Sequence, residues 1–169
     1  MIYFKIRTTD ASSLNLFRNC FSNKEFSRML YDDAPVNITK YIESNVDDIK
    51  YTLSFRYSND ATYVDLGFAN CYKKNDGTYT YVGGIDPCYF NSGIGVKANI
   101  AMISYIYSKH PNIVLTTGIY KYNIRSIKMN EAIGFKKTGT TESKILYGIK
   151  KSDFDNIFVR KILENIVYE

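Results

Sequence analysis

A glycine turn between a predicted strand and a predicted helix is the segment of this sequence best suited to bind an anion. It comprises Asn91, Ser92, Gly93, Ile94, Gly95 and Val96, and it follows a strand that ends near Ile85. Two glycines let the backbone bend sharply and let a ligand approach it closely. The first amides of a helix have no partner inside the helix, and the helix dipole adds only about 0.3–1 kcal/mol, so converging amides would do most of the binding. A phosphate or diphosphate is the natural ligand of such a turn, although the same residues also suit an ordinary turn that only starts a helix.

Two other phosphate-binding motifs fit this turn poorly. The dinucleotide fingerprint needs its first glycine directly after the strand and an acidic residue about 20 residues further on. Here Pro87 and its neighbours intervene, and residues 115–123 contain no Asp or Glu. The Walker-type loop requires Gly-Lys-Ser/Thr, which does not follow Gly95. We therefore predict neither type of nucleotide-binding loop.

A second candidate segment begins at Asn123, where a predicted strand gives way to a predicted helix. Asn123 is a natural helix N-cap, which is a purely structural role. It would also stand at the carboxyl end of a strand parallel to the one that leads into the glycine turn. Ligands favour this position in open α/β sheets. Gly134 is a favourable residue for ending the helix, and Phe135 is its hydrophobic follower.

The hydropathy pattern predicts one mixed α/β sheet that would hold these two segments side by side. Alternation over residues 2–7 predicts a first strand, and three β-rich runs predict an antiparallel meander with an Asp-Gly hairpin at Asp76 and Gly77. The three runs are residues 51–57, 61–73 and 78–86, and further strands are expected from residue 113, over 136–140 and over 144–149. A largely buried helix should follow the glycine turn, because one helical face carries Val96, Ile100, Ile103 and Tyr107.

Helices are also expected towards both ends of the chain. Asp10 can cap a helix that carries Phe17 and Phe21, and short helices are expected over residues 25–30 and from residue 37 to residue 42. Near the C-terminus, Ser152 and Asp155 form a capping box for one terminal helix. The apolar stripe of that helix predicts core packing, with the seam of a homodimer as the alternative. The stripe comprises Phe154, Ile157, Phe158, Ile162 and Ile166.

Composition narrows the class of protein to which the chain can belong. With 169 residues it should form a single domain, residues 1–169, and its 45% apolar residues exclude intrinsic disorder. Because no apolar run reaches the ~18–20 residues of a membrane span and no secretion signal is visible, we expect a soluble, cytoplasmic protein with no membrane partner. The net charge of +5 is spread over short basic doublets, which disfavours a nucleic-acid partner. Three cysteines and one histidine, without a C-x-x-C pair, disfavour a disulfide framework and a metal site.

The two candidate segments together resemble the signature of the GNAT N-acetyltransferase superfamily. That signature has an apolar residue, any residue, Pro, and then Gln/Arg-x-x-Gly-x-Gly/Ala. This chain offers Ile85, Pro87 and Phe90-x-x-Gly93-x-Gly95. A later block of the family, Asn-x-x-Ser/Ala-Ile…Gly-Phe, is matched by Asn123, Ser126, Ile127, Gly134 and Phe135. The resemblance covers residues 79–149.

This resemblance implies a mostly antiparallel central sheet with splayed parallel strands 4 and 5, flanking helices and an additional C-terminal helix. It also implies acetyl-CoA as cosubstrate and no metal. The amides of residues 91–96 would cradle the diphosphate of coenzyme A, and the Ile85 backbone would pair with the pantetheine arm. Asn123 would bind that arm from the other side, and Ser126 is a further coenzyme-binding candidate. The implied reaction is direct attack of a primary amine on the thioester in a ternary complex, but the sequence does not identify the amine.

Three positions depart from the pattern of the family. Phe90 replaces the usual Gln or Arg, Asn130 stands where many members carry a tyrosine acid, and Tyr79 stands near the position of a glutamate base. A tyrosine is a poor base at neutral pH, since its ordinary pKa is about 10. General acid–base help is worth about 10²–10⁴-fold, whereas positioning can supply ~7–11 kcal/mol. We therefore expect a slower transferase that relays protons through water, with Tyr79 and Asn130 as the catalytic candidates.

The sequence leaves open an alternative function and the role of one acidic pair. The departures at Phe90 and Asn130 also suit a catalytically weak member that binds acyl-CoA as a sensor or regulatory module. In either case Asp32 and Asp33 lie between the early helices, where they could attract a cationic amine or simply be solvated.

Overall fold

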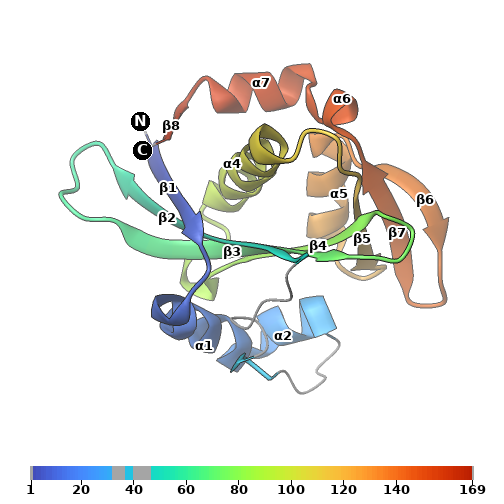
Figure 1. Cartoon of the computed structure of the whole chain (residues 1–169). Helices are drawn as coiled ribbons and strands as arrows, with labels where there is room; N and C mark the ends of the chain where they lie inside the picture. The colour runs from blue at the N-terminus through green and yellow to red at the C-terminus, as the bar shows by residue number, and fades with distance from the viewer. Residues whose placement is uncertain (1, 32–36, 40–46, 169) are drawn as a thin grey trace.

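A central sheet with helices on both faces organises the protein in the computed structural model, which describes residues 2–31, 37–39 and 47–168 (Figure 1). Within the described residues the sheet has eight strands in the order β6-β7-β5-β4-β3-β2-β1-β8. The strands are β1 (Ile2–Thr8), β2 (Ile49–Tyr57), β3 (Val64–Lys73), β4 (Tyr79–Ile85), β5 (Leu115–Tyr120), β6 (Lys136–Thr140), β7 (Lys144–Ile149) and β8 (Ile166–Tyr168). Neighbouring strands are antiparallel except for β4 with β5 and β1 with β8. The mostly antiparallel mixed sheet expected from the sequence is confirmed.

The helices form two layers (Figure 1). On one face lie η1 (Ala11–Ser13), α1 (Leu14–Ser22) and α2 (Lys24–Tyr31). On the opposite face lie α4 (Ile94–Lys109), α5 (Ile124–Ile133), α6 (Lys151–Phe154) and α7 (Ile157–Leu163). A short 3-10 turn, η2 (Pro87–Tyr89), links β4 to the turn before α4. Among the described residues, no helix combines the length and the apolar character needed to cross a membrane.

The parallel strands β4 and β5 are paired only at one end. Tyr79 pairs with Leu115 and Thr80 with Thr116, and no register pair joins these two fully described strands beyond that point. On its other side, β4 stays paired with β3 as far as Ile85. The strands therefore separate towards their carboxyl ends, as the predicted splayed strands require, and the free edge of β4 is left with unpaired backbone groups.

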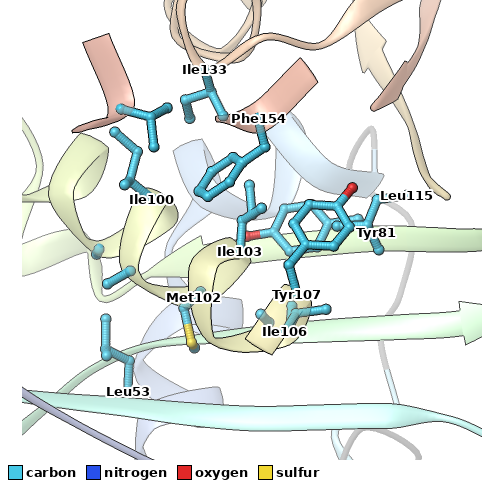
Figure 2. Close-up of a cluster of buried hydrophobic side chains, with 14 of the residues drawn as sticks. Leu53, Tyr81, Ile100, Met102, Ile103, Ile106, Tyr107, Leu115, Ile133 and Phe154 are labelled. Carbon is cyan, nitrogen blue, oxygen red and sulfur yellow. The ribbon is translucent and has the colours of Figure 1, made fainter. Parts of the chain in front are cut away.

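Packing of α4 against the sheet forms the main core (Figure 2). Ile100, Ile103 and Tyr107 of the predicted helical face are fully or almost fully buried, as is Leu53 of β2 on the facing sheet. The Tyr107 hydroxyl donates a hydrogen bond of 2.9 Å to the carbonyl of Ile149. The buried length of α4 fixes the position of its N-terminus, where the glycine turn lies.

A second, aromatic cluster attaches α1 and α2 to the other face of the sheet. Phe17 of α1 and Phe68 of β3 are buried, with ring centroids 4.8 Å apart. Phe26 of α2 lies 6.2 Å from Phe68 and stacks against Phe90 at 6.4 Å and 17°. Through Phe90, the residue three positions before Gly93, this cluster also contacts the loop that leads into the glycine turn.

The C-terminal region contains helix, as expected, but as two short helices, α6 and α7, which are followed by the strand β8. Asn156 separates the two helices: its side chain accepts a hydrogen bond of 3.0 Å from the Val159 amide and starts α7. The proposed capping box at Ser152 is wrong, because α6 starts after Lys150 without a side-chain cap. Core packing of the whole apolar stripe is also wrong, since Ile157 is 73% exposed, whereas the alternative of a homodimer seam stays a prediction. Ile166 lies in β8, which pairs with β1, because the free edge of β1 offers the end of the chain backbone partners that a helix cannot use.

Two expectations fall largely on segments outside the described residues. These are the acidic pair Asp32 and Asp33 and the helix from residue 37 to residue 42, of which only residues 37–39 are described.

Candidate functional site

A cleft of about 570 Å³ opens beside the part of β4 that β5 leaves unpaired. Its walls come from β4, the turn before α4, the N-terminal half of α4, most of the length of α5, and α2, with further residues from β2, β3 and α7. Apolar side chains form much of its lining, among them Phe26, Met29 and Met102. The cleft therefore joins the two segments that were singled out in the sequence.

The glycine turn forms the mouth of this cleft at the start of α4. Gly93 is the N-cap of α4 with φ of 78°, a left-handed conformation that favours glycine, and a Cβ at this position would have no heavy atom within 4 Å. Gly95 differs from Gly93, because a Cβ at position 95 would come within 3.1 Å of Ile85 Cδ1 on β4, and that side-chain end would have to shift slightly. The turn thus exposes backbone at Gly93 and brings α4 close to β4 at Gly95.

Not every residue of the predicted run faces the cleft. Asn91, Gly93, Gly95 and Val96 line it, as does Ile85, whereas the lining includes neither Ser92 nor Ile94. The Ser92 hydroxyl donates to the Tyr89 carbonyl at 2.7 Å and accepts a bond of 3.3 Å from the Ile94 amide. Ile94 itself is buried in the core. These two residues therefore shape the turn, and the amide of Ile94 is already engaged.

Asp86 anchors the loop between β4 and the turn. Its side chain accepts a bond of 3.0 Å from the Cys88 amide and one of 3.1 Å from Asn19 Nδ2 on α1. Burial opposes ionisation of this carboxyl, but the hydrogen bonds from Cys88 and Asn19 outweigh burial and hold the pKa of Asp86 below its usual value. The charged form is thus favoured, and it ties the loop to the helix layer across the sheet.

The N-terminus of α5 forms the facing wall. The Asn123 side chain accepts a bond of 3.2 Å from the Ser126 amide, which confirms its role as N-cap, and both residues line the cleft. Gly134 ends the same helix in a left-handed conformation with φ of 114°, as expected. The N-termini of two helices, α4 and α5, therefore border one cleft beside a free strand edge.

Solved structures match the chain over almost its whole length, although no protein-family model and no curated protein sequence matches it. A domain from Methanocaldococcus jannaschii is 21% identical, with a TM-score of 0.72 and coverage of 88% of this chain and 99% of that domain. An aminoglycoside acetyltransferase in complex with coenzyme A is 14% identical, with a TM-score of 0.69 and coverage of 90% and 97%. The spermidine N-acetyltransferase from Vibrio cholerae, in complex with coenzyme A and spermine, is 13% identical, with a TM-score of 0.70 and coverage of 90% and 98%.

The chain has the GNAT fold. Its antiparallel meander, its separating parallel strands β4 and β5 and its helices on both faces agree with the architecture that the sequence resemblance implied. A shared fold does not establish a shared reaction, which depends on the residues that form the site.

The two residues predicted to be catalytic within the GNAT pattern lie outside the lining of the cleft. Tyr79 lies at the paired end of β4, opposite Leu115, at the far end of the strand from Ile85. Asn130 is buried, and its Nδ2 donates to the Ser126 carbonyl at 2.8 Å and to Ser126 Oγ at 3.2 Å. The side chain of Asn130 is thus engaged within α5, the helix to which it belongs.

Arg125 reaches the glycine turn from α5 and was missed in the sequence. Its Nη1 donates to Asn91 Oδ1 at 2.7 Å, and its Nη2 lies 3.1 Å from Glu25 Oε1 on α2. The guanidinium carbon also lies 5.5 Å from the ring centroid of Phe90, the residue that replaces the usual Gln or Arg of the GNAT signature. No local pattern pointed to Arg125, because Asn91 and Glu25 lie 34 and 100 positions away from it.

A second pair that the sequence did not indicate lies deeper in the cleft. The Tyr81 hydroxyl donates a hydrogen bond to Asn99 Oδ1, and Asn99 Nδ2 lies 3.8 Å from Met129 Sδ. All three residues line the cleft. Burial raises the pKa of Tyr81 well above its usual value, so this phenol stays protonated.

Proposed function

We propose that this protein is an acetyl-CoA-dependent N-acetyltransferase that acetylates a primary amine by direct attack in a ternary complex. The observation that supports the proposal most is the free edge of β4, which lies in one cleft with the N-termini of α4 and α5. An extended ligand arm with amide groups can pair with that edge as a strand would, while an anion at its end lies against the helix N-termini. Structural neighbours of the same fold are acetyltransferases in complex with coenzyme A.

The residues of the site fit coenzyme A both at the mouth of the cleft and within it. At the mouth, a ligand can approach the backbone at Gly93, where a Cβ would project into open space, and Arg125 provides a cation beside Asn91. Within the cleft, the backbone around Ile85 has no strand partner on the β5 side. The thioester supplies the activated acyl group, and the chain orients it against the amine and excludes water.

The proposed coenzyme contacts follow from these positions. The amides of residues 91–96 that are not engaged in the turn would bind the diphosphate, and the Ile85 backbone would pair with the pantetheine arm. Asn123 and Ser126 would face that arm from α5. We expect the protein to be cytoplasmic and to act without a metal or a nucleic-acid partner.

Titration calorimetry with acetyl-CoA and with coenzyme A tests whether the protein binds the coenzyme. We expect both to bind, and absence of binding for both would refute the proposed function. Release of free thiol across a panel of amines, peptides, polyamines and aminoglycosides then tests transfer. Release with at least one acceptor is expected.

One alternative function has an observation in its favour. Neither Tyr79 nor Asn130 is part of the cleft lining, which also suits a protein that binds acyl-CoA as a sensor and transfers poorly. Tight binding of acetyl-CoA without thiol release from any acceptor would support the sensor and contradict the transferase.

Removing the guanidinium at the turn should weaken coenzyme binding. In the Arg125→Ala variant we expect the affinity for coenzyme A to fall about tenfold, the effect of losing one charge-assisted hydrogen bond of about 1.5 kcal/mol. The Glu25→Gln variant should bind more tightly than the wild type, because the carboxylate 3.1 Å from Arg125 competes with a phosphate for the same cation. Calorimetry at low and at high salt measures both effects, which should shrink as salt screens the charges.

Arg160→Ala is the matched control for this pair of variants. Arg160 lies on α7 in an exposed ion pair of 2.8 Å with Asp155 and is not part of the cleft lining. Its removal should leave coenzyme affinity unchanged. Equal affinities in Arg125→Ala and Arg160→Ala would show that the cation at the turn does not contact the ligand.

A further inference from the structure

Tyr81 lies on β4 between the end of this strand that pairs with β5 and the end that does not. Thr80, the residue before it, is the last one that pairs with β5, and Ile85 ends the free edge. Tyr81 belongs to the buried cluster in Figure 2, yet it also lines the cleft, as Tyr79 does not. An extended arm that enters at the glycine turn and follows residues 85 to 82 would therefore bring its reactive end to Tyr81.

The side chain of Tyr81 is directed along the strand towards this open end. A Cβ at Gly83 would lie only 2.5 Å from the Tyr81 hydroxyl oxygen, so the hydroxyl lies over the Gly83 backbone. Only glycine at position 83 leaves room for it. The sequence Tyr81-Val82-Gly83 thus places a hydroxyl group on the floor of the cleft.

The Tyr81 hydroxyl has a neutral hydrogen-bond acceptor, the side-chain amide of Asn99. The hydroxyl donates its hydrogen to Asn99 Oδ1, and Asn99 Nδ2 in turn donates to Met129 Sδ on α5. Burial raises the pKa of Tyr81, so the phenol retains its hydrogen at every pH at which a transferase would be measured. A hydroxyl can rotate about its C–O bond, and a hydrogen bond to an anion is about twice as strong as one to a neutral amide oxygen.

Position 130 carries an asparagine where many members of the GNAT superfamily carry a tyrosine acid. When an amine attacks the thioester, a C–N bond forms and the C–S bond breaks, and the bonding electron pair leaves with the sulfur as a thiolate. The proton lost by the amine passes to solvent. A fixed donor that faces the sulfur lowers the barrier, and such donors contribute about 10²–10³-fold in other enzymes.

We propose that the Tyr81 hydroxyl donates a hydrogen bond to the departing coenzyme A thiolate and stabilises it without transferring its proton, in place of the tyrosine absent at position 130. This role rests on the proposed transferase function. The thiolate is released after it gains a proton from water, so Tyr81 begins and ends each turnover as a neutral phenol. Asn99 acts as a positioning residue that holds the hydroxyl until the charge develops.

The test uses coenzyme A itself and needs no acceptor. Bound thiolate absorbs in the ultraviolet, so a pH titration of the complex measures the pKa of the bound thiol. In Tyr81→Phe we expect that pKa to be higher than in the wild type by about one unit, because a hydrogen bond to the charged form favours it. Affinity for desulfo-coenzyme A, which has no sulfur to contact, should change by less than about threefold, a factor worth under 1 kcal/mol.

Tyr107→Phe is the matched control, because Tyr107 is an equally buried tyrosine whose hydroxyl bonds to the Ile149 carbonyl and which is not part of the cleft lining. It should leave the thiol pKa unchanged. Should Tyr81→Phe fail to fold, Gly83→Ala displaces the same hydroxyl with the tyrosine retained, and it should raise the thiol pKa likewise.

The outcomes separate the two proposals. If the wild-type protein does not bind coenzyme A, the proposed function itself is wrong. If it binds but the thiol pKa is the same in the wild type, Tyr81→Phe and Gly83→Ala, then the role of Tyr81 is wrong while the proposed function stands. Once an acceptor is known, Tyr81→Phe should lower kcat with little change in KM for acetyl-CoA.

Discussion

Replacing Gly93 with aspartate should abolish coenzyme A binding while the protein stays folded. The Cβ position of Gly93 has no heavy atom within 4 Å, so the new side chain would project from the turn into the mouth of the cleft without a clash. There its carboxylate would face the diphosphate. Two like charges about 4 Å apart at an effective dielectric constant of about 20 repel by about 4 kcal/mol, so the affinity should fall by more than about 100-fold in calorimetry.

Gly77→Asp provides a control that carries the same backbone strain. Gly77 lies in the hairpin between β3 and β4 with φ of 81°, close to the 78° of Gly93, and its Cβ position is also open. Both variants should lose roughly 1 kcal/mol of folding free energy from the left-handed conformation, but only Gly93→Asp should lose the ligand. Unchanged coenzyme affinity in Gly93→Asp would mean that the diphosphate binds elsewhere.

Phe68→Ala should cause the largest loss of stability that we expect from a single substitution outside the α4 core. Phe68 is buried on β3 and contacts the rings of Phe17, Phe21 and Phe26 at centroid distances of 4.8, 6.1 and 6.2 Å. Truncating a buried phenylalanine typically costs about 3–5 kcal/mol. Urea denaturation measures this loss directly as a lower midpoint.

The substitution should also affect the cleft. Phe26 and Phe68 both line it, and Phe26 stacks on Phe90 next to the glycine turn. Val64→Ala, an exposed position on the same strand, is the control and should change the free energy of unfolding by less than about 0.5 kcal/mol. A loss below about 1 kcal/mol for Phe68→Ala would show that α1 and α2 do not depend on this cluster.

The parts of the fold that could be predicted depend on residues close together in the sequence. The Asp76-Gly77 hairpin, the Asn123 N-cap and the left-handed Gly134 at the end of α5 are all present as expected. Each is decided by backbone conformation and hydrogen bonds within about one turn. The buried face of α4 belongs to the same group, because its helical spacing is visible without knowledge of its partner.

The C-terminal region shows where local patterns fail. The apolar spacing of residues 154–166 suits a helix, and yet Ile166 and its neighbours form β8. The competing partner is the free edge of β1, more than 150 residues away in the sequence, and nothing near Ile166 indicates that this edge is available. Tertiary pairing there outweighs local helix preference.

Local sequence was enough to predict the glycine turn, the capped helix at Asn123 and, through their resemblance to a family signature, the fold in which the two meet. Which side chains share the cleft depends on contacts between distant segments. The tertiary structure brings Arg125 to Asn91 and Glu25, directs the Tyr81 hydroxyl over Gly83 towards Asn99, and leaves Tyr79 and Asn130 outside the lining. Backbone conformation is set by neighbours in the chain, whereas side-chain partners are set by strand register and helix packing between distant segments, which no local pattern records.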